Sequence, residues 1–220
     1  MLSRKEIWAF IAIVSTDMIH ATLSNNVTTL DELYDLFDCG SFYNTERPIN
    51  SDEEWSHAVN QYRAVVGEDA SIESFYSGFN VSYEVQQFDG KGRGVVALED
   101  IKMGQIVYHM ITTAVFGDGE SYRQFLFRLD KGFACDVFVH WAYVYEETDG
   151  ENYIGVDLDP GSYMNDADHP LEEKERNVDC STGIGRATRD ISAGEELLCS
   201  YSDFHEDYGW EDFGLGDTWD

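Results

Sequence analysis

Three short segments between residues 90 and 201 could bind a ligand and act on it. They are residues 90–94, which read Gly-Lys-Gly-Arg-Gly, residues 163–166, which read Tyr-Met-Asn-Asp, and residues 194–201, which read Gly-Glu-Glu-Leu-Leu-Cys-Ser-Tyr. Glycines at alternate positions let a backbone loop approach a ligand closely, because no Cβ lies in the way. An ordinary glycine hairpin is the alternative, and the helix of a dinucleotide-binding loop does not follow.

The polar side chains of the second and third segments are suited to positioning a small cationic group. The hydroxyl of Tyr201 could form a hydrogen bond with a bound group, and aromatic faces stabilise cations by roughly 0.5–2 kcal/mol. The simpler interpretations are an Asx turn at Asn165 and a packed surface tyrosine at Tyr201. The chemistry would therefore depend on a fold that brings the three segments together.

Two longer stretches of sequence resemble each other. One directly follows the first segment, and the other overlaps the third. Residues 95–107 read Val-Val-Ala-Leu-Glu-Asp-Ile-Lys-Met-Gly-Gln-Ile-Val, and residues 187–197 read Ala-Thr-Arg-Asp-Ile-Ser-Ala-Gly-Glu-Glu-Leu. With the order of the three segments, they make residues 79–206 resemble the SET domain. The resemblance implies the SET β-clip, a β-rich (α+β) fold of small curved sheets with a pseudoknot, preceded here by a short helical segment.

The resemblance also implies an activity, which is methyl transfer from S-adenosylmethionine to the side-chain amine of a protein lysine. It assigns the catalytic role to Tyr201. Trp210 or Phe213 would cover the adenine, because the chain lacks the cysteine-rich, zinc-binding tail of many members. The implied cofactor-binding residues are Lys91, Gly92, Arg93, Asn165, Asp166, Tyr201, Trp210 and Phe213.

The sequence departs from the family pattern at several positions near the site. Asp166 and Ala167 replace the usual His and Ser, and Asn177 is the candidate for a second, displaced asparagine. Cys199 stands where the family often has an aromatic residue. These departures keep open an alternative of another class, a catalytically inactive SET-like module that binds a basic protein partner.

The periodicity of apolar residues predicts the elements that position these segments. Spacings of three and four residues predict helices over residues 30–37 and from Ser51 to a stop at Gly67. Strands are predicted over residues 81–88, 94–97, 106–109, 133–139 and 142–145. The predicted organisation is an acidic helical segment at 25–78, the SET domain at 79–206 and an acidic aromatic tail at 207–220.

The net charge of the chain limits the classes of partner that are expected. There are 43 Asp and Glu against 14 Lys and Arg, which gives a formal net charge of −29. This charge repels a phosphate backbone, so direct binding of nucleic acid is not expected. It attracts a basic protein or peptide substrate, although a surface that merely keeps the protein soluble explains the same composition.

The cysteines and the N-terminus bear on the compartment. Four widely spaced cysteines form no Cys-x-x-Cys pair, so we expect no metal site, and three disulfide pairings remain open. Residues 1–24 have a basic start and an apolar run at 7–14, as in a signal peptide, and that run is too short to span a bilayer. A signal peptide implies the secretory pathway or entry into an organelle. The alternative, an amphipathic helix packed on the domain, leaves the nucleus or cytoplasm open.

Overall fold

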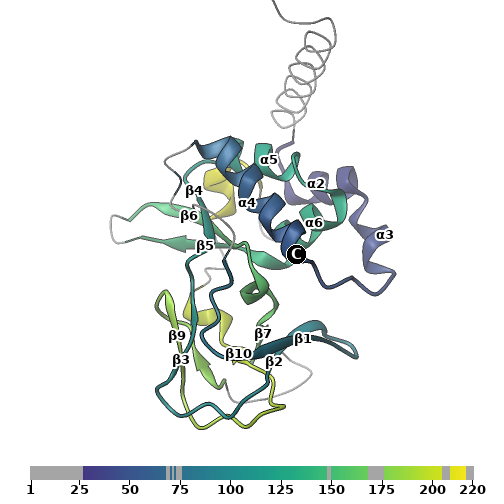
Figure 1. The fold of residues 1–220 in the computed structure, drawn as a ribbon. Helices are drawn as coiled ribbons and strands as arrows, with labels where there is room; N and C mark the ends of the chain where they lie inside the picture. The colour runs from purple at the N-terminus through teal and green to yellow at the C-terminus, as the bar shows by residue number, and fades with distance from the viewer. Residues whose placement is uncertain are drawn as a thin grey trace, which may run out of the picture.

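The fold is that of a computed structural model, which describes residues 27–67, 70, 72, 76–147, 150–167, 176–204 and 209–216. The predicted signal peptide at 1–24 lies outside these residues. No helix within these ranges combines the length and the apolar character needed to cross a membrane. Figure 1 shows the helices gathered around one sheet at one end of the molecule, with the remaining small sheets at the other end.

The two helices predicted in the N-terminal segment are confirmed. Helix α2 spans Leu30–Phe37 and begins at Thr29, whose side chain accepts a hydrogen bond from the backbone N–H of Glu32. Helix α4 spans Asp52–Val66 and begins with a capping box between Ser51 and Glu54. Such caps satisfy backbone N–H groups that the first helical turn leaves unpaired. A short helix, α3 (Cys39–Tyr43), lies between them.

The strands of the described residues form four small sheets, which confirms the predicted β-rich (α+β) fold class. The antiparallel sheets are β1 (Tyr83–Phe88) with β2 (Gly92–Ala97), β3 (Ile106–His109) with β9 (Ile184–Ala187) and β8 (Val178–Asp179), and β4 (Thr113–Phe116) with β6 (Asn152–Asp157) and β5 (Ala142–Glu146). The fourth sheet pairs β7 (Asn165–Asp166) with β10 (Leu198–Cys199) in parallel.

The strand predicted over residues 133–139 is wrong. Helix α6 spans Lys131–Asp136, and a π-helical turn, η1, continues it over Val137–Trp141. The β-branched and aromatic run misled the prediction, because its side chains are buried on all sides rather than on alternate positions. The other helical elements of the described chain are α5 (Gly119–Leu126), η2 (Pro160–Tyr163), η3 (Tyr201–Asp203) and η4 (Trp210–Phe213).

Strand β10 crosses between segments that are far apart in the sequence. The backbone N–H of Leu197 donates to the carbonyl of Val95 at 2.8 Å, on the side of β2. On the other side, the N–H of Ala167 donates to the carbonyl of Cys199 at 2.7 Å. The buried side chain of Asn177 also accepts a hydrogen bond from the N–H of Leu198 at 2.8 Å. These contacts produce the crossing expected of the pseudoknot and bring the three motifs together.

Two disulfides tie these parts of the fold. Cys39 of α3 is bonded to Cys135 of α6, which fastens the N-terminal helices to the rest of the molecule. Cys180 is bonded to Cys199 of β10, two residues before Tyr201. Of the three pairings that the sequence left open, the structure therefore has this one.

Candidate active site

The three motifs line a single cleft with a volume of about 1090 Å³. The cleft lies between the β1–β2 hairpin, the η2–β7 segment and the start of η3, with residues 43–47 on one side. The predicted site residues that line it are Lys91, Gly92, Arg93, Asn165, Asp166, Tyr201 and Trp210. The structure thus assembles seven of the eight residues from segments that are up to about 120 positions apart in the sequence.

Glu196 joins the three motifs through one buried carboxylate. Its Oε1 accepts a hydrogen bond from Asn165 Nδ2 at 2.9 Å, and its Oε2 forms an ion pair with Lys91 Nζ at 3.0 Å. Asn165 Nδ2 also donates to the backbone carbonyl of Arg93 at 3.0 Å. Asn165 is therefore held by both neighbouring motifs. Glu196 was not among the predicted site residues, although it stands within the Gly-Glu-Glu-Leu motif.

Two glycines shape the edge of the cleft in different ways. Gly92 has a φ of +79°, and a Cβ built there would meet no atom within 4 Å, so its backbone is open toward a ligand. A Cβ at Gly94 would lie 2.8 Å from both Asn165 Nδ2 and Glu196 Oε1. The alternating glycines thus combine an accessible backbone with close packing behind it.

Tyr201 is fixed at the start of η3 by two hydrogen bonds. Its hydroxyl donates to the carbonyl of Met164 at 3.1 Å, and its N–H donates to Asp166 Oδ1 at 3.1 Å. Burial, followed by the negative charges of Asp166 and Glu196, raises the pKa of the Tyr201 phenol far above its usual value. The hydroxyl therefore stays protonated near neutral pH, and it can orient a group in the cleft but cannot accept a proton as phenolate.

The departures from the family pattern at Asp166 and Asn177 are accommodated by local hydrogen bonds. Asp166 braces the crossing by accepting the N–H of Tyr201, where the family has an imidazole. Asn177 is 1% exposed and donates through Nδ2 to the carbonyl of Glu196 at 2.8 Å. Asn177, the displaced asparagine expected from the sequence, therefore lies beside the site and contacts the backbone of Glu196.

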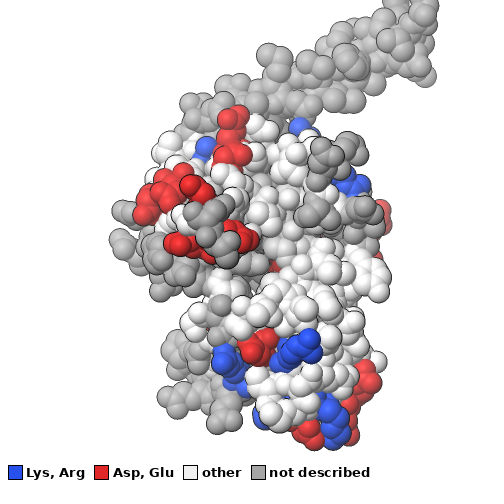
Figure 2. Space-filling view, turned by 90° about the vertical axis from the view of Figure 1, so that its left-hand side faces the viewer, with Lys and Arg blue, Asp and Glu red and all other residues white. Residues whose placement is uncertain are grey.

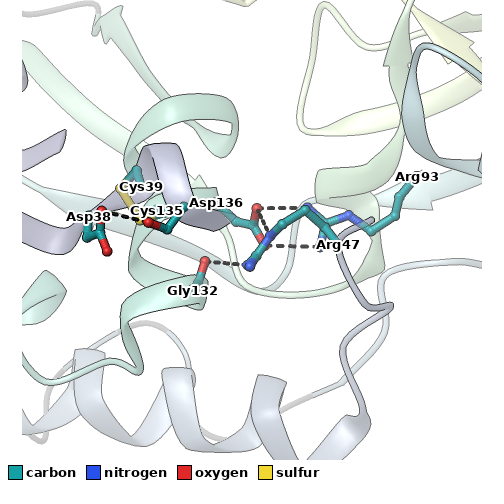
Figure 3. The surroundings of a disulfide bond; sticks show 8 residues. Asp38, Cys39, Arg47, Arg93, Gly132, Cys135 and Asp136 are labelled. Carbon is teal, nitrogen blue, oxygen red and sulfur yellow. Dashed lines mark hydrogen bonds and ion pairs between the residues drawn. A yellow bond between two sulfur atoms is a disulfide. The ribbon is translucent and has the colours of Figure 1, made fainter. Parts of the chain in front are cut away.

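The guanidinium of Arg93 is committed to a buried ion network (Figure 3). Its Nη2 lies 2.9 Å from Asp136 Oδ1, and Arg47 Nη2 lies 2.8 Å from Asp136 Oδ2. The Arg93 guanidinium also stacks over the rings of Tyr163 and Trp141, at 4.7 and 5.3 Å from their centroids. A cofactor contact by Arg93 stays a prediction, and its backbone is the part that adjoins Asn165.

The two aromatic residues predicted to cover a cofactor lie in different places. Trp210 lines the cleft and is 5% exposed. Phe213 does not line the cleft, because its side chain is buried beside Gly119 and its carbonyl accepts a hydrogen bond from Arg123 Nη1 at 3.0 Å. The structure therefore gives no support to Phe213 as a cofactor contact.

Several residues of the cleft were missed by sequence reasoning. They are Arg47, Tyr143, Asp157 and Phe204. The ring of Phe204 lies 5.7 Å from that of Tyr201 and 5.1 Å from that of Tyr143, so the three rings form one aromatic wall. Tyr143 and Phe204 stand in segments without a motif, and only their aromatic character could have drawn attention to them.

The comparisons with known proteins give one family match and partial likenesses to solved structures. The SET domain family model matches residues 92–202. One similar fold is ctPRC2 in an autoinhibited conformation bound to S-adenosylmethionine (TM-score 0.39, 21% identity, 62% of this chain and 16% of that chain). Another is ATXR5 in complex with mono-methylated histone H3.1 (TM-score 0.38, 19% identity, 60% of this chain and 61% of that chain). No curated protein sequence matches significantly.

The extent of these matches defines what they establish. The chain spans less than two thirds of the length of either solved chain, and the low identities concern the fold alone. The family model is different, because it covers 111 of the 220 residues, from the glycine loop through Tyr201. This chain therefore belongs to the SET domain family.

Proposed function

We propose that this chain transfers a methyl group from S-adenosylmethionine to the side-chain amine of a lysine in a basic protein or peptide. The observation that carries the proposal is the position of Tyr201. Its hydroxyl is held by the Met164 carbonyl at the aromatic wall of a cleft that the glycine loop and Asn165 also line. Family membership supports the same activity.

The cleft suits S-adenosylmethionine in size and charge. Its volume of about 1090 Å³ slightly exceeds the range of typical ligand sites, which leaves room for a lysine side chain beside the cofactor. The open backbone of Gly92, the side chain of Lys91 and the carboxylate of Asp166 would hold the cofactor. When bound, the cofactor supplies an electrophilic methyl group on a positively charged sulfur.

The residues of the chain mainly provide alignment and a dry environment. An in-line displacement requires the amine nitrogen, the methyl carbon and the sulfur to be collinear, and positioning alone can contribute several kcal/mol. The wall formed by the rings of Tyr143, Phe204 and Tyr201 would exclude water and favour a cation beside it. The neutral Tyr201 hydroxyl is placed to orient the amine.

The charge of the surface supports a basic substrate. Figure 2 shows a group of acidic side chains on the upper half of one face, while the lower half carries Lys and Arg side chains together with further acidic ones. With a net charge of −29, the chain attracts Lys- and Arg-rich segments over distances of about a Debye length. Encounter rates with a basic peptide should therefore fall as salt concentration rises.

The activity is tested by methyl transfer from radiolabelled S-adenosylmethionine. The purified chain is offered a mixture of basic proteins and peptides, and the labelled residue is identified by mass spectrometry. Label on lysine supports the proposal. Absence of label on every substrate, together with absence of cofactor binding, would contradict it.

Replacing Gly94 by alanine should weaken cofactor binding. The added Cβ would lie 2.7 Å from Phe88 Cε2 and 2.8 Å from Asn165 Nδ2, so the asparagine must move. Overpacking of this kind costs about 1–3 kcal/mol, which corresponds to a roughly 5- to 150-fold loss of affinity if it falls on the binding site. Calorimetric titration of Gly94→Ala with S-adenosylmethionine measures the loss.

Gly183→Ala provides the matched control for Gly94→Ala. A Cβ added at Gly183 would meet no atom within 4 Å, and the residue lacks a positive φ, so this variant should bind the cofactor as the wild type does. Equal affinities for the two variants would show that the packing behind Asn165 does not matter for the site.

A SET-like module without catalysis is the second candidate. The two disulfides favour it, because disulfides persist in oxidising compartments, where an exported chain would meet little cytosolic cofactor. This candidate binds a basic partner without cofactor. We propose entry into the secretory pathway as its compartment, and a C-terminal fluorescent fusion tests this, since a nuclear signal would count against a signal peptide.

A further inference from the structure

Methyl transfer in this cleft requires that the substrate ammonium ion first loses a proton. A lysine side chain in water is mostly an ammonium ion at neutral pH, with a pKa of about 10.4, and only the neutral amine has a lone pair to attack the methyl carbon. Tyr201 cannot remove the proton, because burial raises its pKa and keeps the phenol neutral but blocks the phenolate. Another residue of the cleft must act as the acceptor, or the substrate must arrive already neutral.

Asp157 has the position of such an acceptor. It ends strand β6 directly opposite Thr113 of β4, and it lines the same cleft as Tyr201. Thr113 Oγ1 donates a hydrogen bond to Asp157 Oδ1, which fixes the plane of the carboxylate. The Asp157 Oδ2 atom forms no hydrogen bond with a described residue and is not among the enclosed, unpaired polar atoms, so it is open to the cleft.

The aromatic wall connects Asp157 to Tyr201. Tyr143 stands on β5, opposite Gly155 of β6, and lines the same cleft as Asp157. The ring of Tyr143 packs against Phe204, which in turn packs against Tyr201. The phenol of Tyr201 and the side chain of Asp157 thus line one cleft, which the aromatic wall also borders.

The groups around Asp157 leave its charge without compensation. Asp159 of the same segment and the phenols of Tyr108 (β3) and Tyr143 (β5) face it, and none of them is cationic. Asp159 itself is satisfied by the Tyr108 hydroxyl at 2.8 Å and by two backbone N–H groups at 2.7 Å. Within the described parts of the chain no Lys, Arg or His forms an ion pair with Asp157. A cationic substrate group in the cleft could therefore pair with this carboxylate.

We propose that Asp157 is the proton acceptor that converts the substrate ammonium into the attacking amine. The N–H bond of the ammonium breaks and the proton moves to the Asp157 carboxylate, which leaves the lone pair on the nitrogen. The nitrogen then forms a bond to the methyl carbon while the carbon–sulfur bond breaks and its electron pair stays on sulfur. The product is a methylated ammonium ion and a neutral thioether, and Asp157 returns its proton to water. This step rests on the proposed methyltransferase activity.

The acid–base properties of Asp157 suit this role near neutral pH. Burial, followed by repulsion from Asp159, raises the pKa of Asp157 to about 7. A proton acceptor works best when its pKa lies near the working pH. The rate should therefore rise as the pH increases through about 7, because the carboxylate must be ionised to accept the proton.

Asp157→Asn tests the proposal through the pH profile of single-turnover methyl transfer. The variant keeps the shape of the side chain and should retain cofactor affinity, while the rate at pH 7 falls roughly 10²-fold, at the low end for loss of a general base. The deficit should shrink as the pH rises toward the pKa of the lysine itself. Glu146→Gln, at the exposed end of β5, removes a carboxylate outside the cleft and should leave the profile unchanged.

A second measurement keeps the proposal falsifiable if Asp157→Asn does not fold. The wild-type profile is compared for a peptide with lysine and for one with thialysine, whose amine is less basic. If the rate rises with pH around pH 7 for both peptides, the result supports Asp157 as the proton acceptor. If the pH of this rise shifts with the basicity of the substrate amine, the result overturns the proposal. An active wild type whose Asp157→Asn variant shows the same profile also overturns it. A wild type that transfers no label to any substrate and binds no cofactor refutes the activity itself.

Discussion

Tyr201→Phe should transfer methyl groups roughly 10²–10³-fold more slowly than the wild type, the range found when one oriented hydrogen-bonding group is removed from an active site. Cofactor affinity should not change, because the ring remains and only the hydroxyl is lost. The variant lacks the hydroxyl that is held by the Met164 carbonyl and that would orient the amine. Single-turnover transfer of radiolabel to the best basic substrate, combined with calorimetric titration of the cofactor, separates the two effects.

Tyr76→Phe is the control for loss of a tyrosine hydroxyl. Tyr76 is 67% exposed and does not line the cleft, so its variant should keep the wild-type rate. If Tyr201→Phe also kept that rate, the assignment of Tyr201 as the catalytic residue would be wrong. If it lost cofactor binding, Tyr201 would instead be part of the cofactor site.

Asp136→Asn should lower the free energy of unfolding by about 3–5 kcal/mol, the cost of removing one partner from a buried ion pair. Asp136 is 0% exposed, and its two oxygens hold the guanidiniums of Arg47 and Arg93. Without the carboxylate charge, two buried cations repel each other with no compensation. Figure 3 shows that the Cys39–Cys135 disulfide adjoins this network. The substitution should therefore also disturb the packing of α3 against α6.

Chemical denaturation measures this change, and Asp130→Asn is its control. Asp130 precedes the same helix, is exposed and makes no capping hydrogen bond through its side chain, so its variant should unfold within about 0.5 kcal/mol of the wild type. A loss below about 1 kcal/mol for Asp136→Asn would mean that the network contributes little to stability, as exposed ion pairs do.

The elements that could be predicted are those whose sequence signals are local. Helices α2 and α4 carry their own caps, at Thr29 and at Ser51 with Glu54, and an apolar face that repeats every three to four residues. The hairpin of β1 and β2 has glycines at its turn. The helix over residues 133–139 was not predicted, because its position depends on partners far away in the sequence. The Cys135 disulfide and the Asp136 ion pairs join it to residues more than 40 positions away.

The same distinction explains which site residues were found. Lys91, Asn165 and Tyr201 stand in motifs, and the structure brings all three to one cleft. The Arg47–Asp136 pair joins residues 89 positions apart, and neither of them stands in a motif. Asp157 follows an ordinary strand pattern, and its open carboxylate becomes visible only when β4, β5 and β6 are assembled.

Calorimetric titration of the purified chain with S-adenosylmethionine tests most directly whether this cleft is a methyltransferase site. We expect saturable binding of one cofactor per chain, retained in Tyr201→Phe and Gly183→Ala and weakened in Gly94→Ala. Absence of saturable binding by the wild-type chain would contradict the proposed activity and favour the SET-like interaction module.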